Sequence, residues 1–152
     1  MLEDSGMPRL LVVHHTPSPN LQAVLEAVRD GVALVEEVQL VARPALSAGA
    51  ADLLEADGVL LGTPANIGYM SGALKHFFDT VYYPCLDATV GLPYGVYVHG
   101  GDDTAGALSA IQRITGALRW KQVAAPLSLT GPPSAEDLEA CRELAATVAI
   151  SL

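Results

Sequence analysis

The stretch VLLGTPANIGYMSGALKHFFD, residues 59–79, changes from one pattern of hydrophobic residues to another. Residues 59–62 form a short apolar run of the kind found in strands buried on both faces. From residue 70 onward, large apolar side chains recur at the spacing of an amphipathic helix, which we expect over residues 70–82. The stretch therefore predicts a buried strand, a loop over residues 62–70 and a helix, which together make one unit of an α/β fold.

The same alternation extends along the chain in both directions. Strands are expected over residues 9–14, 33–40, 59–62, 95–99 and 121–125. Helices are expected over residues 20–30, 47–56, 70–82, 104–118 and 134–149. Gly31 is expected to end the first helix, Ser47 to cap the second, and Ser134 to cap the last in a capping box with Asp137.

Strictly alternating strands and helices predict a parallel sheet with helices on both faces. Five strands fit the doubly wound order 2-1-3-4-5. In such sheets ligands bind beyond the carboxyl ends of the strands, where the strand order reverses. This rule directs attention to loop 1 (residues 14–20), loop 2 (62–70) and loop 3 (99–104).

Length and charge narrow the function classes. The chain has 152 residues, which suits one domain, predicted over residues 9–152 after a flexible leader at 1–8. Eight Lys and Arg residues against 17 Asp and Glu give a net charge of −9, which disfavours nucleic-acid binding. The acidic balance is compatible with basic redox partners and equally with solubility alone.

The apolar segments are too short for a membrane span, and the N-terminus lacks a secretory signal core. Cys85 and Cys141 are far apart and lack metal-binding or redox spacing, so reduced thiols and a cytoplasmic location are expected. The apolar excess of the chain, together with Tyr82, Tyr83 and Pro84 near a helix end, suggests a homodimer or a higher homo-oligomer.

Loop 1 reads HHTPSPN and leads directly into the first helix. Backbone N–H groups, hydroxyls and the helix dipole at such a position can bind a phosphate dianion. The candidate donors are Thr16, Ser18, Asn20 and the amide of Leu21. An ordinary N-cap turn explains the same residues, so this loop alone leaves both interpretations open.

Loop 2 contains Pro64, which restricts the backbone, and Gly68, which permits a positive φ and a close approach to a ligand. Tyr69 could lie beside a flat ring. In loop 3, Gly100 and Gly101 allow the backbone to pass close to a bound ring, and the following aspartates suit the start of a helix.

Residues 62–79 resemble the second flavin loop and following helix of Trp-repressor-binding-protein-type NAD(P)H:quinone oxidoreductases, NADPH-dependent FMN reductases and their flavodoxin relatives. The shared frame is Gly-Thr-Pro at 62–64, then Gly68, Met70, Gly72 and Asp79. The turn at 99–102 is similar to the glycine-aspartate turn after the fourth flavodoxin strand. The resemblance implies a flavodoxin-like three-layer sandwich that binds FMN.

By this resemblance, loop 1 holds the FMN phosphate, loop 2 lines the isoalloxazine ring and loop 3 closes its other side. The residues implied are Thr16, Ser18, Asn20, Leu21, Pro64, Ala65, Asn66, Ile67, Gly68, Tyr69, His99, Gly100, Gly101 and Asp102. The resemblance further implies NAD(P)H as a co-substrate and a quinone or similar acceptor. No catalytic acid or base and no metal ligand is predicted.

Two alternatives to a reductase remain open. A non-enzymatic flavodoxin-type electron carrier would share the fold, the FMN and the acidic charge. A cofactor-free interaction module is favoured by Pro17 and Pro19, which remove two N–H donors from loop 1. A metal site at His14 and His15 is disfavoured, because neighbouring residues of a strand point to opposite faces.

Overall fold

A computed structural model describes residues 6–152 of the chain. Its strands are β1 (Arg9–His14), β2 (Gln39–Pro44), β3 (Gly58–Asn66), β4 (Tyr69–Met70), β5 (Pro93–Gly100), β6 (Lys121–Gln122) and β7 (Leu127–Thr130). Its helices are α1 (Pro19–Ala33), α2 (Ala50–Leu54), α3 (Gly72–Cys85), α4 (Ala105–Ala117) and α5 (Ala135–Ile150). The predicted leader lies largely outside the described residues.

The strands form one sheet in the order β2-β1-β3-β5-β6, with β7 also paired to β5 and β4 paired to β3. Every pairing is parallel except that of β4 with β3. The predicted order is therefore confirmed, but two short strands occupy the place of the predicted strand 121–125. They are separated by residues 123–126, the last of which is Pro126 and has no N–H to donate to the ladder, so β7 begins beyond the predicted range.

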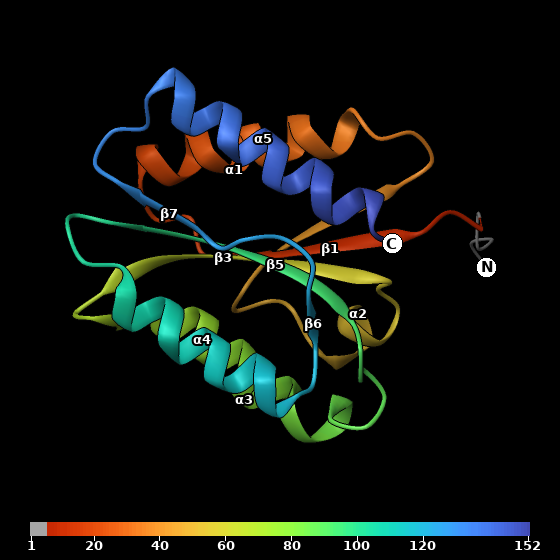
Figure 1. Cartoon of the computed structure of the whole chain (residues 1–152). Helices are drawn as coiled ribbons and strands as arrows, with labels where there is room; N and C mark the ends of the chain where they lie inside the picture. The colour runs from red at the N-terminus through yellow and green to blue at the C-terminus, as the bar shows by residue number, and fades with distance from the viewer. Residues whose placement is uncertain (1–5) are drawn as a thin grey trace.

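Helices cover both faces of the sheet in three layers (Figure 1). Helices α1 and α5 lie on one face, and α3 and α4 lie on the other. Leu21, Val24, Leu25 and Val28 form the buried stripe of α1, as their spacing predicts. In the part of the chain that the structure describes, no helix is both long and apolar enough to cross a membrane.

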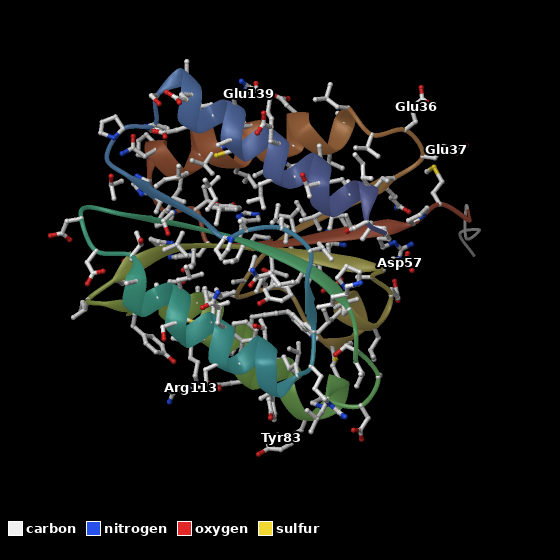
Figure 2. The ribbon with its side chains drawn as sticks, viewed as in Figure 1. Glu36, Glu37, Asp57, Tyr83, Arg113 and Glu139 are labelled. Atoms are coloured by element: carbon white, nitrogen blue, oxygen red, sulfur yellow. The ribbon has the colours of Figure 1, made fainter. Side chains whose placement is uncertain are left out.

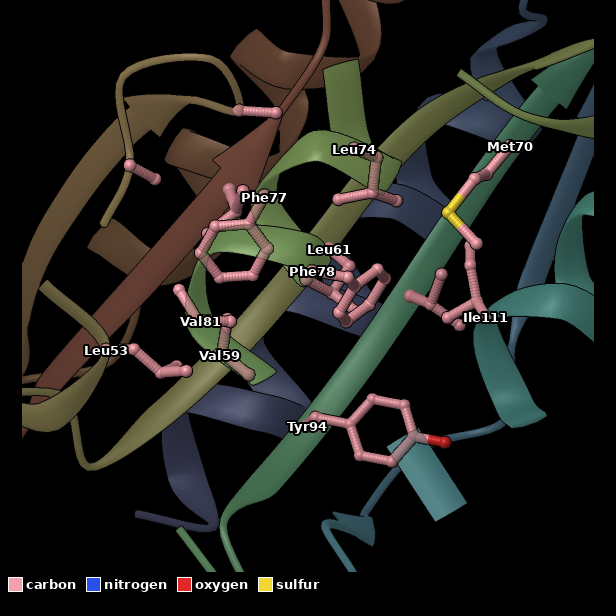
Figure 3. Packing of buried hydrophobic residues seen from close by; sticks show 14 of the residues in the cluster. Leu53, Val59, Leu61, Met70, Leu74, Phe77, Phe78, Val81, Tyr94 and Ile111 are labelled. Atoms are coloured by element: carbon pink, nitrogen blue, oxygen red, sulfur yellow. The ribbon is translucent and has the colours of Figure 1, made fainter. Parts of the chain in front are cut away.

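Each face of the sheet has its own buried hydrophobic cluster. One includes Leu10, Val12 and Leu60 beneath α1 and α5. The other fills the space between the sheet and α3 and α4, where Phe77 and Phe78 pack with their ring centroids 5.7 Å apart (Figure 3). Burying this much apolar surface on both faces makes the sheet a rigid base for its loops.

Several predicted boundaries are wrong, three of them between α1 and α2. Gly31 does not end α1 but is buried within it, and the helix continues to Ala33. The second strand is not at 33–40, because residues 33–38 complete the helix and turn at Glu37, where φ is 62°. Ser47 does not cap α2; the helix begins after Gly49, whose N–H donates to Asp52 Oδ2 at 3.0 Å.

The first strand and the start of the last helix lie where the sequence predicted them. Residues 9–14 form β1. Ser134 caps α5, its hydroxyl accepting from the Asp137 N–H at 3.0 Å while Asp137 Oδ2 accepts from the Ser134 N–H at 2.9 Å. This reciprocal pair is the predicted capping box.

Candidate functional site

Loops 1, 2 and 3 meet at the carboxyl edge of the sheet, on the left of Figure 1. The His15 N–H donates to the Gly62 carbonyl at 3.0 Å, which ties loop 1 to the end of β3. Pro64 of β3 lies opposite His99 of β5 in the parallel ladder, which places loops 2 and 3 side by side. The labelled acidic residues Glu36, Glu37 and Asp57 lie at the opposite edge (Figure 2).

Loop 1 ends in a capped helix start. Ser18 is the N-cap of α1, and its hydroxyl accepts from the Leu21 N–H at 3.2 Å. Pro19 occupies the first turn, where a missing N–H costs nothing because no intrahelical acceptor exists for it. Since the Leu21 amide is already engaged by Ser18, its predicted role toward phosphate requires this bond to be exchanged.

Three backbone donors of loop 1 have no partner among the described residues. Among the described residues, none accepts a hydrogen bond from the backbone N–H of Thr16, Ser18 or Asn20. The first turn of α1 carries no acidic side chain to neutralise the positive end of the helix dipole. This arrangement of free backbone amides at a helix start matches what a phosphate group requires.

Loop 2 is a β-hairpin rather than the open loop expected from the sequence. Strand β3 continues to Asn66, which pairs with Tyr69 of β4. Between them Ile67 and Gly68 have φ of 51° and 73°, as in a type I′ turn. Pro64, expected in the loop, lies within β3 and is buried.

A buried pair of hydroxyls braces the base of this hairpin. Thr63 Oγ1 lies 3.0 Å from Ser71 Oγ and accepts from the Ser71 N–H at 3.0 Å. Ser71 Oγ in turn accepts from the Leu74 N–H at 3.2 Å and caps α3. Sequence reasoning missed both residues, although a serine three positions before a helical leucine is a recognisable cap signal.

The tip of the hairpin presents apolar side chains to solvent at the site. Ile67 is fully exposed and Tyr69 is 40% exposed. The rear of the tip rests on α4, because a β-carbon at Gly106 would overlap the Gly68 carbonyl oxygen and lie 3.0 Å from its carbon. A supported apolar wall of this kind can contact a planar ring.

Loop 3 is held from two sides. The Gly131 carbonyl oxygen can only accept, so His99 donates its Nε2–H to it at 2.8 Å. Asp102 Oδ1 accepts from the Asp103 N–H at 2.6 Å, and Asp103 Oδ1 accepts from the Ala105 N–H at 2.9 Å. Both predicted aspartates therefore stabilise the turn before α4, as their position at a helix start suggests.

The glycines of loop 3 differ in their surroundings. A β-carbon at Gly100 would lie 3.3 Å from Ala65 Cβ, so the end of β5 and loop 2 are in close contact. Gly101 is exposed, with open space around its α-carbon. The structure thus brings the predicted residues of loops 2 and 3 together, and leaves room at the exposed rim.

His14 lies beneath loop 1 and is 9% exposed. Its Nδ1 is 2.7 Å from Thr16 Oγ1. Burial, with smaller contributions from Arg29 and His15, holds the pKa of His14 below its usual value of 6.5. His14 is therefore neutral at pH 7 in the ligand-free chain. Among residues 6–152, no group of three or more His, Cys, Asp and Glu side chains is placed to hold a metal ion.

The sequence of residues 29–129 matches the family described as NADPH-dependent FMN reductase. This chain belongs to that family. The predicted resemblance is confirmed, and the family description names both FMN and NADPH, in agreement with the predicted cofactor and co-substrate. The match spans loops 2 and 3 but not loop 1, so the assignment of loop 1 depends on its geometry.

Two curated relatives share part of the chain. A flavodoxin of Aquifex aeolicus is 33% identical over 75 residues, covering 49% of this chain and 40% of that protein. The quinone-oxidoreductase QR2 of Triphysaria versicolor is 36% identical over 69 residues, covering 42% of this chain and 34% of that protein. The matched stretches thus span well under half of these relatives' lengths.

Solved structures confirm the flavodoxin-like fold. A flavodoxin from the domain Archaea superposes with a TM-score of 0.81 at 19% identity, covering 94% of this chain and 97% of that one. The WrbA-like flavodoxin of Agrobacterium tumefaciens superposes with a TM-score of 0.74 at 20% identity, covering 96% and 97%. At such identities the likeness establishes the fold, while the roles of individual residues remain predictions.

Proposed function

We propose that this chain binds FMN at the three-loop edge and transfers electrons from NAD(P)H to a small acceptor such as a quinone. The observation that carries the proposal is the start of α1, where the amides of Thr16, Ser18 and Asn20 have no described partner, at the same sheet edge as the β3–β4 hairpin. These donors fit the phosphate of FMN without any cationic side chain, because a helix N-terminus itself stabilises an anion.

The chain's own contribution is to bind and orient the cofactor. Thr16, Ser18 and Asn20 would hold the phosphate, and the exposed hairpin tip would line the ring. The N–H groups of Ile67 and Gly68 donate to no described acceptor, so they are available to the polar edge of a heterocycle. Bound FMN would supply the hydride and electron transfer, and no side chain need act as acid or base.

The first test is a titration of the purified protein with FMN, followed by flavin fluorescence and visible absorbance. Wild type should bind one FMN per chain. Asn20→Leu and Gly68→Val should weaken binding by about tenfold or more, because each removes or distorts a group that contacts the ligand. NAD(P)H oxidation with a quinone acceptor then tests for reductase activity.

Two control variants match these substitutions. Gly91 has a φ of 80° and open space like Gly68, but precedes β5 at the opposite edge, so Gly91→Val imposes the same backbone strain away from the site. Gln22→Leu alters an exposed residue of α1 just after Asn20. Both should bind FMN like wild type.

The outcomes separate three functions. FMN binding with NAD(P)H oxidation supports the reductase. FMN binding without such oxidation favours an electron carrier, with which the net charge of −9 is compatible. No binding at high micromolar FMN contradicts both and favours a cofactor-free interaction module. Our further proposals are a small-molecule acceptor or redox protein as partner, a homodimer or higher homo-oligomer, and a cytoplasmic location.

A further inference from the structure

His14 occupies a position from which it can control the hydroxyl of Thr16. It is the last residue of β1 and follows Val12 on the face of the sheet that packs beneath α1. A hydrogen bond between His14 Nδ1 and Thr16 Oγ1, which are 2.7 Å apart, joins this buried imidazole to the side chain of Thr16. Thr16 is in turn one of the residues proposed to hold the phosphate.

The direction of this hydrogen bond decides what Thr16 can offer a ligand. A threonine hydroxyl has one hydrogen to donate. If Nδ1 accepts that hydrogen, Thr16 faces the ligand with lone pairs only, which repel a phosphate oxygen. If Nδ1 carries a proton and donates it to Thr16 Oγ1, the threonine hydrogen is free to point at the phosphate.

The groups around His14 define its electrostatic setting. Its neighbour His15 and Arg29 of α1 are the charged or titratable groups that act on it. Gly62 of β3 lies opposite His14 in the parallel ladder, and Tyr97 of β5 lies opposite Gly62. The Tyr97 hydroxyl is fully buried and has no hydrogen-bond partner among the described residues. None of the carboxylates in residues 6–152 is among the groups that act on His14, so an arriving phosphate would bring the opposing charge.

We propose that His14 is a positioning residue: it donates its Nδ1–H to Thr16 Oγ1 and so directs the Thr16 hydroxyl hydrogen at the phosphate of the bound flavin nucleotide. This inference rests on the proposed function, because it takes the α1 start as the phosphate site. It adds His14, which acts on the ligand through Thr16 and does not touch the ligand itself.

The proposal has a consequence for pH. A phosphate dianion near His14 favours the doubly protonated imidazole, so binding raises the pKa of a group whose pKa is low in the free chain. FMN binding then takes up a proton, and affinity falls as pH rises from the lowered pKa of His14 in the free chain towards its raised pKa in the complex. Riboflavin has no phosphate and should show no such dependence.

The test compares FMN with riboflavin from pH 6 to 9 by fluorescence titration of the apoprotein. His14→Leu and Thr16→Val should each lower the preference for FMN over riboflavin about tenfold at pH 7, because a hydrogen bond to a charged group is lost. His14→Asn keeps a donor and should retain that preference within about threefold, but lose the pH dependence due to the imidazole. The exposed residue His76 provides the control, His76→Asn.

The titration of the phosphate itself, near pH 6, is common to wild type and His14→Asn and cancels in their comparison. An independent readout is the ¹⁵N spectrum of His14, in which FMN should shift the population toward forms protonated at Nδ1. This measurement, Thr16→Val and His14→Asn keep the proposal testable if His14→Leu does not fold.

A merely structural role for His14 would alter FMN and riboflavin binding equally. The proposal is overturned if FMN is preferred over riboflavin but the preference is unchanged in His14→Leu and Thr16→Val. It is also overturned if the ¹⁵N spectrum of the FMN complex shows His14 without a proton on Nδ1. If neither flavin binds wild type, the proposed function fails and this inference fails with it.

Discussion

Gly31 of α1 lies directly against the backbone of Arg142 of α5. A β-carbon at Gly31 would overlap the Arg142 carbonyl oxygen and lie 2.9 Å from its carbonyl carbon and α-carbon. Helices α1 and α5 therefore touch backbone to backbone at this point, on the face of the sheet that supports loop 1 (Figure 1). Close contact of this kind explains a glycine inside a helix, where its flexibility is otherwise unfavourable.

We expect Gly31→Ala to destabilise the fold by about 2 kcal/mol or more, because the added methyl group forces two packed helices apart. Urea unfolding monitored by circular dichroism measures the change in the free energy of unfolding. Gly116→Ala in α4 is the matched control, since its β-carbon would meet no atom within 4 Å. It should stabilise by about 0.5–1 kcal/mol. Equal stabilisation by both substitutions would contradict the close contact.

This contact shows why sequence patterns misplaced the end of the first helix. Gly31 in an amphipathic pattern reads as a helix terminator, because the sequence does not reveal a partner 111 positions away, Arg142. The misplaced second strand has a related cause. The apolar residues 33–35 favour a strand over 33–40, but α1 continues through Ala33 and the chain turns before β2.

The meeting of the three loops of the candidate site at one edge was predictable for a general reason. In an alternating α/β chain the carboxyl ends of the parallel strands lie at one edge of the sheet. Once the strands are assigned, the loops that follow them therefore identify this edge. The hairpin in loop 2 was not predictable, because it requires Ile67 to adopt a positive φ that β-branched residues disfavour. The contact of His14 with Thr16 likewise depends on side-chain geometry that spacing does not encode.

The support of loop 2 by α4 can be tested separately from loop 1. Gly106→Ala should push the hairpin tip away from α4, because the new methyl group would overlap the Gly68 carbonyl oxygen. We expect FMN and riboflavin affinity to fall by a similar factor, about tenfold, since the ring wall moves while the phosphate donors stay. The measurement is the dissociation constant of FMN and that of riboflavin, each for Gly106→Ala and for the control Gly116→Ala. A loss of affinity for FMN but not for riboflavin would contradict the assignment of the ring to loop 2 and the phosphate to loop 1.

The turn residue Ile67 stores backbone strain at the site. It has a φ of 51° and is fully exposed, so no burial compensates for its conformation. Ile67→Asn should raise the free energy of unfolding by about 1 kcal/mol, because asparagine tolerates the left-handed region. Urea unfolding provides the value, and Val90→Asn at another exposed β-branched position serves as the control. A loss of stability in Ile67→Asn would show that the isoleucine makes a compensating contact.

Cys141 gives the fold a defined sensitivity to alkaline pH. This thiol of α5 is fully buried, and burial, followed by the charge of Asp137, raises its pKa from 9.0 to about 11. The neutral thiol is thus favoured in the folded chain, and the associated stability is complete below pH 9 and is lost as pH rises through 11. The loss amounts to about 2–3 kcal/mol, since each pKa unit corresponds to about 1.4 kcal/mol. Urea unfolding of wild type and Cys141→Ala between pH 7 and 11 should show the two stabilities converging as the pH increases. Other groups titrate in both proteins and cancel in the difference, so parallel curves would mean that the Cys141 thiol ionises as readily in the folded chain as in the unfolded one.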